Sequence, residues 1–362
     1  MPEPLLYSAE PVVEIDGQVK HEPVRDLLRL DVEEDTEGLK TLVLRVAGTP
    51  AHPDMPDVPE LYLDGSLIDF GKEIAISLGP SGGARTVFKG YVSGIEAVFG
   101  EGQEPRVVVF AEDKLMKLRM TRRFKTYENV TDAQIAEDIA GLHGLGVSAA
   151  GDGPTYDLVQ QWNQSDLAFL RERAARICAE VWIHDDTLHF QTRSNRRATE
   201  LTLVQGNQLL DVQLRADLAH QRTKVKVSGY DAQERGAIDE EAGVDAVTAE
   251  AGSGRTGPAV LERAFGERVS YRVRTVPLAG ADATAWAKAE MLRRCRGFVT
   301  ALGTTNGSPD MAVGSELTLE RVGAPFNGAG YYVTSVHHSW DRTNGFRTRF
   351  AAERPTVNAG GA

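Results

Sequence analysis

One pattern of apolar and polar positions, typical of three successive β-strands, occurs twice in distant parts of the chain. In each copy a glycine precedes a short alternating strand, a Gly-Tyr pair lies in the next strand, and a polar turn leads to a closing strand. The segments are 71–78, 88–92 and 107–113 in the first copy, and 314–320, 330–334 and 347–353 in the second. Glycine-bounded hairpins share some of this pattern by composition alone. We interpret the likeness as a duplicated β-unit, which favours quasi-symmetric assembly.

Residues 1–115 are rich in predicted strands. Thr41–Val46 alternates as a strand does, and prolines at 50, 53, 56 and 59 keep the following segment out of regular structure. Together with the first repeat copy, these short strands and their Gly and Pro turns predict a small barrel or sandwich.

The hydrophobic period changes to that of helices over residues 116–198. Thr131 and Gln134 form a capping box ahead of one helix, and a second helix begins at Ser165. Two strands then flank an Asp185-Asp186 turn. This segment is predicted to be a small α/β insertion domain.

Strands return in residues 199–356, which we predict to form a second barrel. Val225 and Val227 lie on the face opposite to Lys224 and Lys226. The remaining expectations are an exposed acidic loop over 231–258, a strand over 268–274 that resumes the sheet, a helix over 282–298 capped near Asp282, and a flexible tail over 357–362. The fold class is therefore α+β and β-dominated, with two related tube-like β-barrels and an α/β insertion.

Composition indicates an ordinary globular protein of two or three domains. The chain has 362 residues, of which 41% are hydrophobic and 25% charged. Its apolar runs are far shorter than the roughly 18 residues of a membrane span, and the N-terminus has no signal-peptide pattern. Cys178 and Cys295 have no CxxC partner, so we expect buried free thiols on helices of a protein made in a reducing compartment.

The formal net charge of −12 argues against a nucleic-acid-coating surface. One basic cluster, residues 114–125, alternates with apolar residues and is predicted to be a partly buried element whose charged face meets solvent or another subunit.

No sequence motif of catalysis or cofactor binding occurs in a suitable context. The glycines of 79–83 lack the Lys and helix of a phosphate loop and indicate a hairpin turn. His337 and His338 are neighbours in a predicted strand, so they point to opposite faces and do not share a metal. We therefore predict no catalytic, cofactor-binding or metal residues, and no enzyme.

Several segments together resemble the late-control D family of phage tail proteins, the hub of a contractile-tail baseplate, whose fold also forms the N-terminal part of the VgrG-type secretion spike. The matching segments are Phe88–Val92, Ala111–Leu115, Phe124–Tyr127, Gln161–Leu170, Val227–Asp231 and Gly330–His338. Each is weak alone, but their order and spacing extend over nearly the whole chain.

The resemblance implies a homotrimer in which two barrels per chain form a pseudo-six-fold ring around a channel. A six-fold tail tube protein would attach above and a trimeric spike below, with baseplate wedge or sheath-associated proteins outside and DNA or cargo only in transit. The particle would be assembled in the bacterial cytoplasm and act in a virion tail or an extracellular contractile particle. The residues do not distinguish a phage or tailocin from an injection system or secretion apparatus.

Two further expectations concern function. Because the chain ends soon after Arg354-Pro355, where spike fusions continue, we expect the spike to be a separate protein. If part of the negative charge faces the channel, DNA or acidic cargo would be repelled.

The competing interpretation is a carbohydrate-binding or cell-wall-degrading tail enzyme, which would need exposed aromatic faces. The candidate platform residues are Trp162, Trp182, Trp286 and Trp340.

Overall fold

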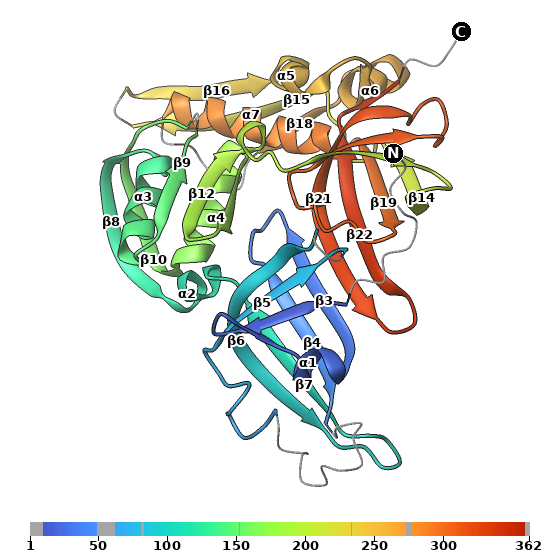
Figure 1. The fold of residues 1–362 in the computed structure, drawn as a ribbon. Coiled ribbons are helices and arrows are strands. Elements are labelled where there is room, and N and C mark those ends of the chain that lie inside the picture. Colours follow the sequence, from blue (N-terminus) through green and yellow to red (C-terminus); the bar gives the residue numbers. More distant parts are fainter. Residues whose placement is uncertain are drawn as a thin grey trace, which may run out of the picture.

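The fold is β-dominated and has four parts, seen in a computed structural model (Figure 1). Residues 10–48, 62–80, 83–151, 153–232, 234–272, 277 and 279–358 are described. In Figure 1 the first β-unit lies at the bottom in blue and cyan, the insertion at the left in green, and the second β-unit at the right in red. A layer in yellow and orange crosses the top.

The first β-unit contains, in its described residues, seven strands and one short helix. Its elements are β1 (Val12–Ile15), β2 (Gln18–Lys20), α1 (Glu22–Arg25), β3 (Leu27–Asp35), β4 (Thr41–Ala47), β5 (Glu73–Leu78), β6 (Arg85–Val98) and β7 (Arg106–Glu112). Strict alternation in β4 turns Leu42, Leu44 and Val46 into the core, where each is at most 1% exposed. The predicted proline segment of 50–59 lies outside the described residues, as does part of the 79–83 turn.

The second β-unit is assembled from two stretches of the chain, as predicted. Its elements are β13 (Glu200–Val204), β14 (Leu209–Ala216), β19 (Val299–Thr305), β20 (Glu316–Glu320), β21 (Gly328–Asp341) and β22 (Gly345–Arg354). The two units join edge to edge in one 13-stranded sheet with the order β14-β19-β22-β21-β3-β4-β7-β6-β5-β1-β2. The strand β20 pairs with β21 and with the parallel strand β13.

The insertion has its own hydrophobic core, and its two longer helices begin at the caps that the sequence predicts. Its elements are α2 (Leu115–Met120), β8 (Arg122–Val130), α3 (Asp132–Leu142), β9 (Gly146–Ala149), β10 (Tyr156–Ser165), α4 (Asp166–Ile177), β11 (Ala179–His184), β12 (Thr187–Thr192) and the 3-10 turn η1 (Arg193–Asn195). Thr131 and Gln134 form the predicted capping box of α3, and Ser165 caps α4. In the basic cluster Leu115 and Leu118 are fully buried, as expected of a partly buried element.

The layer across the top is a separate small sheet covered by a helix. Its elements are β15 (Lys224–Asp231), β16 (Gly236–Ala242), η2 (Val244–Val247), α5 (Thr248–Ala251), β17 (Arg255–Thr256), α6 (Gly257–Phe265), β18 (Val269–Arg272) and α7 (Gly280–Arg296). The strands run in the order β16-β15-β18, and Val225 and Val227 pack under α7 as their alternation predicts.

Three predictions for this part of the chain are wrong. Residues 231–258 are no long exposed loop, because β16, η2, α5 and β17 lie there and Val247 is fully buried. The strand within 268–274 joins the small sheet through β15 and does not resume the large one. The last helix begins at Gly280 after Ala279, and its cap makes no side-chain hydrogen bond, so Asp282 is not the cap.

The predicted flexible tail is partly wrong. Val357 is buried in β23 (Thr356–Val357), which pairs with β17, and Asn358 donates hydrogen bonds to the carbonyl oxygens of Ala324 and Asn327. Residues 359–362 lie outside the described part of the chain. The start of the tail is held because apolar burial and paired backbone outweigh its chain entropy.

Candidate functional site

The two β-units share one hydrogen-bond register. In each unit a tyrosine lies directly between two glutamates on the neighbouring strands. In the first unit it is the Tyr of the Gly-Tyr pair, whereas in the second it is Tyr332, the residue after Gly330-Tyr331, so the sequence pattern aligned the two pairs one residue out of register. The matched residues are Glu73, Tyr91 and Glu112 in the first unit, and Glu316, Tyr332 and Glu353 in the second. The next pairs are also matched, Val92 with Ala111 and Val333 with Ala352. A common register over three strands is far stronger evidence of duplication than similar turn composition is, and it confirms the duplicated unit.

The irregularities of the two units coincide as well. The register shifts directly after Val92 in one unit and after Val333 in the other. The outer strands β3 and β14 shift at equivalent places, after Leu27 and after Leu209. Because β-bulges re-aim a strand at defined positions, matched bulges give the two units the same curvature.

The units meet where the C-terminal half of β21 pairs antiparallel with β3. We call this pairing the internal seam; it extends from Ser335 opposite Asp35 to Asp341 opposite Arg29. On one face of the seam Asp31 accepts hydrogen bonds from Arg29, Arg45 and His337 at 2.6–2.8 Å. Burial raises the pKa of Asp31, but these donors outweigh burial and hold the pKa well below its ordinary value.

The two neighbouring histidines lie on opposite faces of the internal seam, as predicted. His337 belongs to the Asp31 cluster, whereas His338 is buried on the other face. The Nδ1 atom of His338 lies 2.9 Å from Thr348 Oγ1, and Nε2 lies 3.1 Å from the carbonyl oxygen of Met311. A neutral imidazole satisfies both partners, and burial lowers the pKa of His338 to about 3.

A buried ion cluster ties the insertion to both β-units beside the seam. Glu180 of β11 is 7% exposed and accepts from Arg193 Nε, Arg196 Nη1 and the hydroxyl of Tyr332, each at 2.9 Å. Arg196 also donates to Glu34 of β3 at 2.8 Å, and Arg193 pairs with Glu353 of β22. The insertion is therefore positioned by charges that both units supply.

The equivalents of the internal seam are open at the other ends of the two units. Beyond Val92, β6 pairs only with β7, and β14 pairs only with β19, within the part of the chain that the structure describes. Phe99, directly after β6, is 69% exposed. The sequence prediction ended this strand at Val92 and so missed its free half, although the apolar positions of 95–99 carried the signal.

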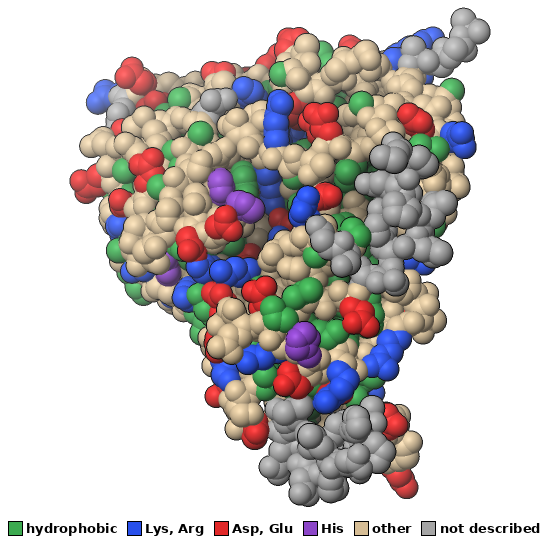
Figure 2. All heavy atoms as spheres, viewed as in Figure 1, with side chains coloured by type: hydrophobic (Ala, Val, Ile, Leu, Met, Phe, Trp, Pro, Cys, Tyr) green, Lys and Arg blue, Asp and Glu red, His purple; other side chains and the backbone are tan. Residues whose placement is uncertain are grey.

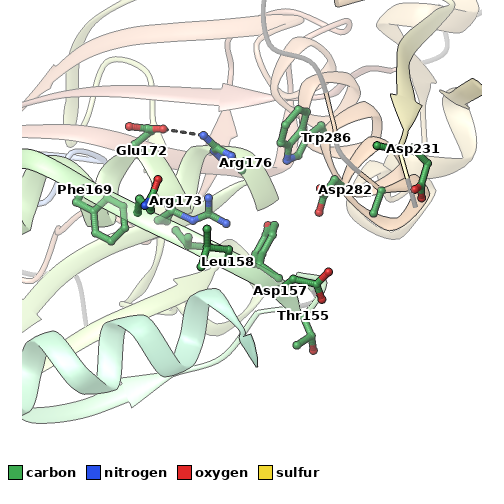
Figure 3. Close-up of a pocket in the computed structure, with 15 residues that line it drawn as sticks. Thr155, Asp157, Leu158, Phe169, Glu172, Arg173, Arg176, Asp231, Asp282 and Trp286 are labelled. Carbon is green, nitrogen blue, oxygen red and sulfur yellow. Dashed lines mark hydrogen bonds and ion pairs between the residues drawn. The ribbon is translucent and has the colours of Figure 1, made fainter. Parts of the chain in front are cut away.

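A cavity of about 600 Å³ lies between the insertion and the top layer. In Figure 3, the pair of Glu172 and Arg176 lies on one side, with Trp286 and Asp282 across the space. Trp286 is 3% exposed, and the guanidinium groups of Arg176 and Arg272 lie 5.2 and 4.9 Å from its ring.

This cavity has no arrangement typical of catalysis. Arg173 donates to Asp132 at 2.5 Å and packs 4.2 Å from the ring of Tyr156, so its charge is already engaged. Acidic and basic residues are both present in the walls. Throughout the described residues, no group of three or more His, Cys, Asp and Glu is placed to hold a metal ion. The geometry is that of a junction between packed layers.

The four tryptophans that could form a carbohydrate platform are scattered; two are buried and a third is partly buried. Trp182 and Trp286 are buried, and Trp340 packs partly against the core of the first unit. Trp162 is 68% exposed and lies opposite Phe124 in the β8–β10 pair. Cys295 is buried in α7, and Cys178 is partly buried at the end of α4; both are free.

Charge on the visible face is mixed. Figure 2 shows Lys and Arg side chains interspersed with Asp and Glu over the first unit and the insertion, without a large patch of one sign. None of the helices in the described ranges is long and apolar enough to cross a membrane.

Comparison with known proteins gives one family and a set of similar folds. The model of the family described as the Alg8 N-terminal domain matches residues 63–341, which is more than half of the chain. This description names a domain and no activity. No protein with curated annotation matches the sequence.

Solved structures with this fold include phage tail proteins. A 43 kDa tail protein of prophage MuSo2 from Shewanella oneidensis has 14% identity and a TM-score of 0.67, with 96% of this chain and 99% of that one covered. A tail protein from Neisseria meningitidis MC58 has 12% identity and a TM-score of 0.66, with 96% and 97% covered. The E. coli c3393 protein, a type VI secretion component similar to the T4 tail proteins gp27 and gp5, has 15% identity and a TM-score of 0.58, with 96% and 77% covered. These likenesses establish the fold.

Proposed function

This chain belongs to the Alg8 N-terminal domain family, and we propose that it is the structural hub of a contractile tail or injection particle. In this role it is a homotrimer that lines the central channel and adapts a six-fold tail tube to a separate trimeric spike. It would act in a virion baseplate or an extracellular contractile particle.

The observation that carries the proposal is the register-matched duplication of the β-unit within one continuous sheet. Two equivalent units per chain convert three-fold symmetry into near six-fold symmetry, so that one face of a trimer can match a hexameric ring and the other a trimeric spike. The whole-length likeness to phage tail proteins supports this use of the fold.

The remaining parts have roles that follow from their positions. The insertion is held beside the internal seam by the Glu180 cluster, so it would brace the ring from outside and meet wedge or sheath-associated proteins. The net charge of −12 favours a channel wall that repels DNA or acidic cargo in transit. A channel wall that proved strongly basic would contradict that part of the proposal.

Sedimentation equilibrium of the purified chain, alone and with its tube and spike proteins, tests the hub. We expect a trimer, and electron-microscopy class averages with six lobes around a pore. Monomers under all of these conditions would refute the proposal.

A carbohydrate-binding role retains one supporting observation, the exposed pair of Trp162 and Phe124. Retention of the wild-type chain, but not of a Trp162→Ala variant, on cell-wall or capsule polymers would favour that role. The hub proposal predicts equal elution of both.

A further inference from the structure

The chain fills one seam between its β-units, and among the described residues the two equivalent edges have no strand partner. We propose that the C-terminal half of β6 in one copy pairs antiparallel with β14 of a second copy, in the register of the internal seam. This inference deepens the proposed hub and rests on it: it names the partner of these edges as another molecule of this chain and specifies which residues meet.

The internal duplication fixes the register. Matching Tyr91 to Tyr332 and following the shared bulge makes Glu96 the equivalent of His337, and Phe99 the equivalent of Trp340. On the other side, Thr41 pairs with Glu112 as Thr300 pairs with Glu353, so the two threonines are equivalent. Glu33 pairs with Thr41 and Arg215 pairs with Thr300, so Arg215 is the equivalent of Glu33.

Replacing each residue of the internal seam by its equivalent therefore gives the pairs expected between two copies. His337 lies opposite Glu33 and Trp340 lies opposite Leu30 in the internal seam. The translated pairs are Ile95 with Ala216, Glu96 with Arg215, Ala97 with Leu214, Val98 with Gln213 and Phe99 with Val212.

The residues brought together by this register are chemically complementary. Glu96 and Arg215 are both exposed and would form an ion pair across the new seam, whereas neither has an ion-pair partner among the described residues. On the opposite face Phe99 would cover Val212 and Leu214, which already pack partly against the core of the second unit. Cross-strand opposite charges and apolar pairs each stabilise a sheet.

Comparison of Phe99 with its equivalent, Trp340, shows that the open edge lacks a packing partner for an aromatic side chain. Trp340, at the filled seam, packs partly against the core of the first unit, whereas Phe99 is 69% exposed. An exposed edge strand with apolar side chains is prone to pair with another strand. Because Figure 1 and the strand order place β6 and β14 in different units at separate parts of the molecule, the contact is head to tail and can close a ring of copies.

Disulfide trapping tests the register with a matched control. Val98→Cys combined with Gln213→Cys places one cysteine on each strand at a predicted pair, and leaves Glu96, Arg215 and Phe99 intact. Val98→Cys combined with Asp217→Cys is the control, because it keeps the same face but displaces the partner by four residues. Each pair is oxidised with diamide and separated on non-reducing gels beside the wild type, which reports any cross-linking through buried Cys295 or partly buried Cys178.

We expect covalent dimers and trimers from the 98/213 pair, and at least tenfold less product from the 98/217 pair. Single Glu96→Arg or Arg215→Glu changes should weaken assembly at least tenfold in sedimentation, and the two combined should restore it. Circular dichroism of each variant checks that it remains folded.

Three outcomes are distinguishable. Trimers that cross-link through 98/213 support the seam. Wild-type trimers with no 98/213 product, or with charge reversals that do not change assembly, overturn the seam and leave the proposed hub standing. A wild-type chain that stays monomeric with tube and spike proteins present overturns both.

Discussion

Acid should destabilise this protein through one buried side chain, His338. The imidazole is 5% exposed, and its two ring nitrogens contact Thr348 Oγ1 and the carbonyl oxygen of Met311. The carbonyl is an acceptor, so Nε2 carries the proton, and Nδ1 of the neutral ring accepts from the threonine hydroxyl. Protonation would place a charge in the core near Lys40 and His337, which also lower the pKa of His338.

The magnitude follows from the two pKa values. Burial lowers the pKa of His338 from 6.5 to about 3, so the unfolded chain binds this proton before the folded one does. Stability is therefore fully present above pH 6.5 and is lost as pH falls toward 3. Each pH unit in this interval costs about 1.4 kcal/mol, which amounts to roughly 3 kcal/mol by pH 4.

Urea unfolding followed by tryptophan fluorescence between pH 7 and pH 4 measures this effect. His338→Gln keeps one donor and one acceptor without a titrating ring, so it should lose about 1–2 kcal/mol at pH 7 yet decline less steeply with acid than the wild type. His184→Gln is the control, because His184 is exposed with a side-chain exposure of 79%. If His338→Gln and wild type lose stability in parallel down to pH 4, the argument from burial is wrong.

Two further predictions concern packing and buried charge. Glu180→Ala leaves the buried Arg196 and the largely buried Arg193 without their shared carboxylate and should cost about 3–5 kcal/mol in urea unfolding. A loss below about 1 kcal/mol would mean that this carboxylate contributes no more than an exposed ion pair does. Gly90→Ala places a Cβ 2.2 Å from the backbone oxygen of Glu112 and should cost more than about 2 kcal/mol. Gly330→Ala has no contact closer than 3.7 Å and only a positive φ of 89°, so it should cost about 1–2 kcal/mol; the reverse order in thermal melts would contradict the close-approach argument.

Local features of this fold were readable from the sequence because neighbouring residues determine them. The capping box at Thr131, the cap at Ser165 and the opposite orientations of His337 and His338 depend on contacts within a few residues. Residues 231–258 were misjudged because their few apolar side chains, such as Val247, need a partner from α7 to form a core.

By itself, the sequence determined that a β-unit occurs twice, since both copies begin with a glycine-led strand and continue with alternating apolar and polar positions. It also predicted most of the strands, the caps at Thr131 and Ser165, and the two longer helices of the insertion. Only the tertiary structure decided that the two units join through β21 and β3 and that β15, β16 and β18 form their own sheet. It also decided that one edge of β14 and of the C-terminal half of β6 has no strand partner within the described ranges. Strand edges pair through backbone N–H and C=O groups, and every residue except proline has both. The sequence of an edge strand therefore does not determine which strand it pairs with.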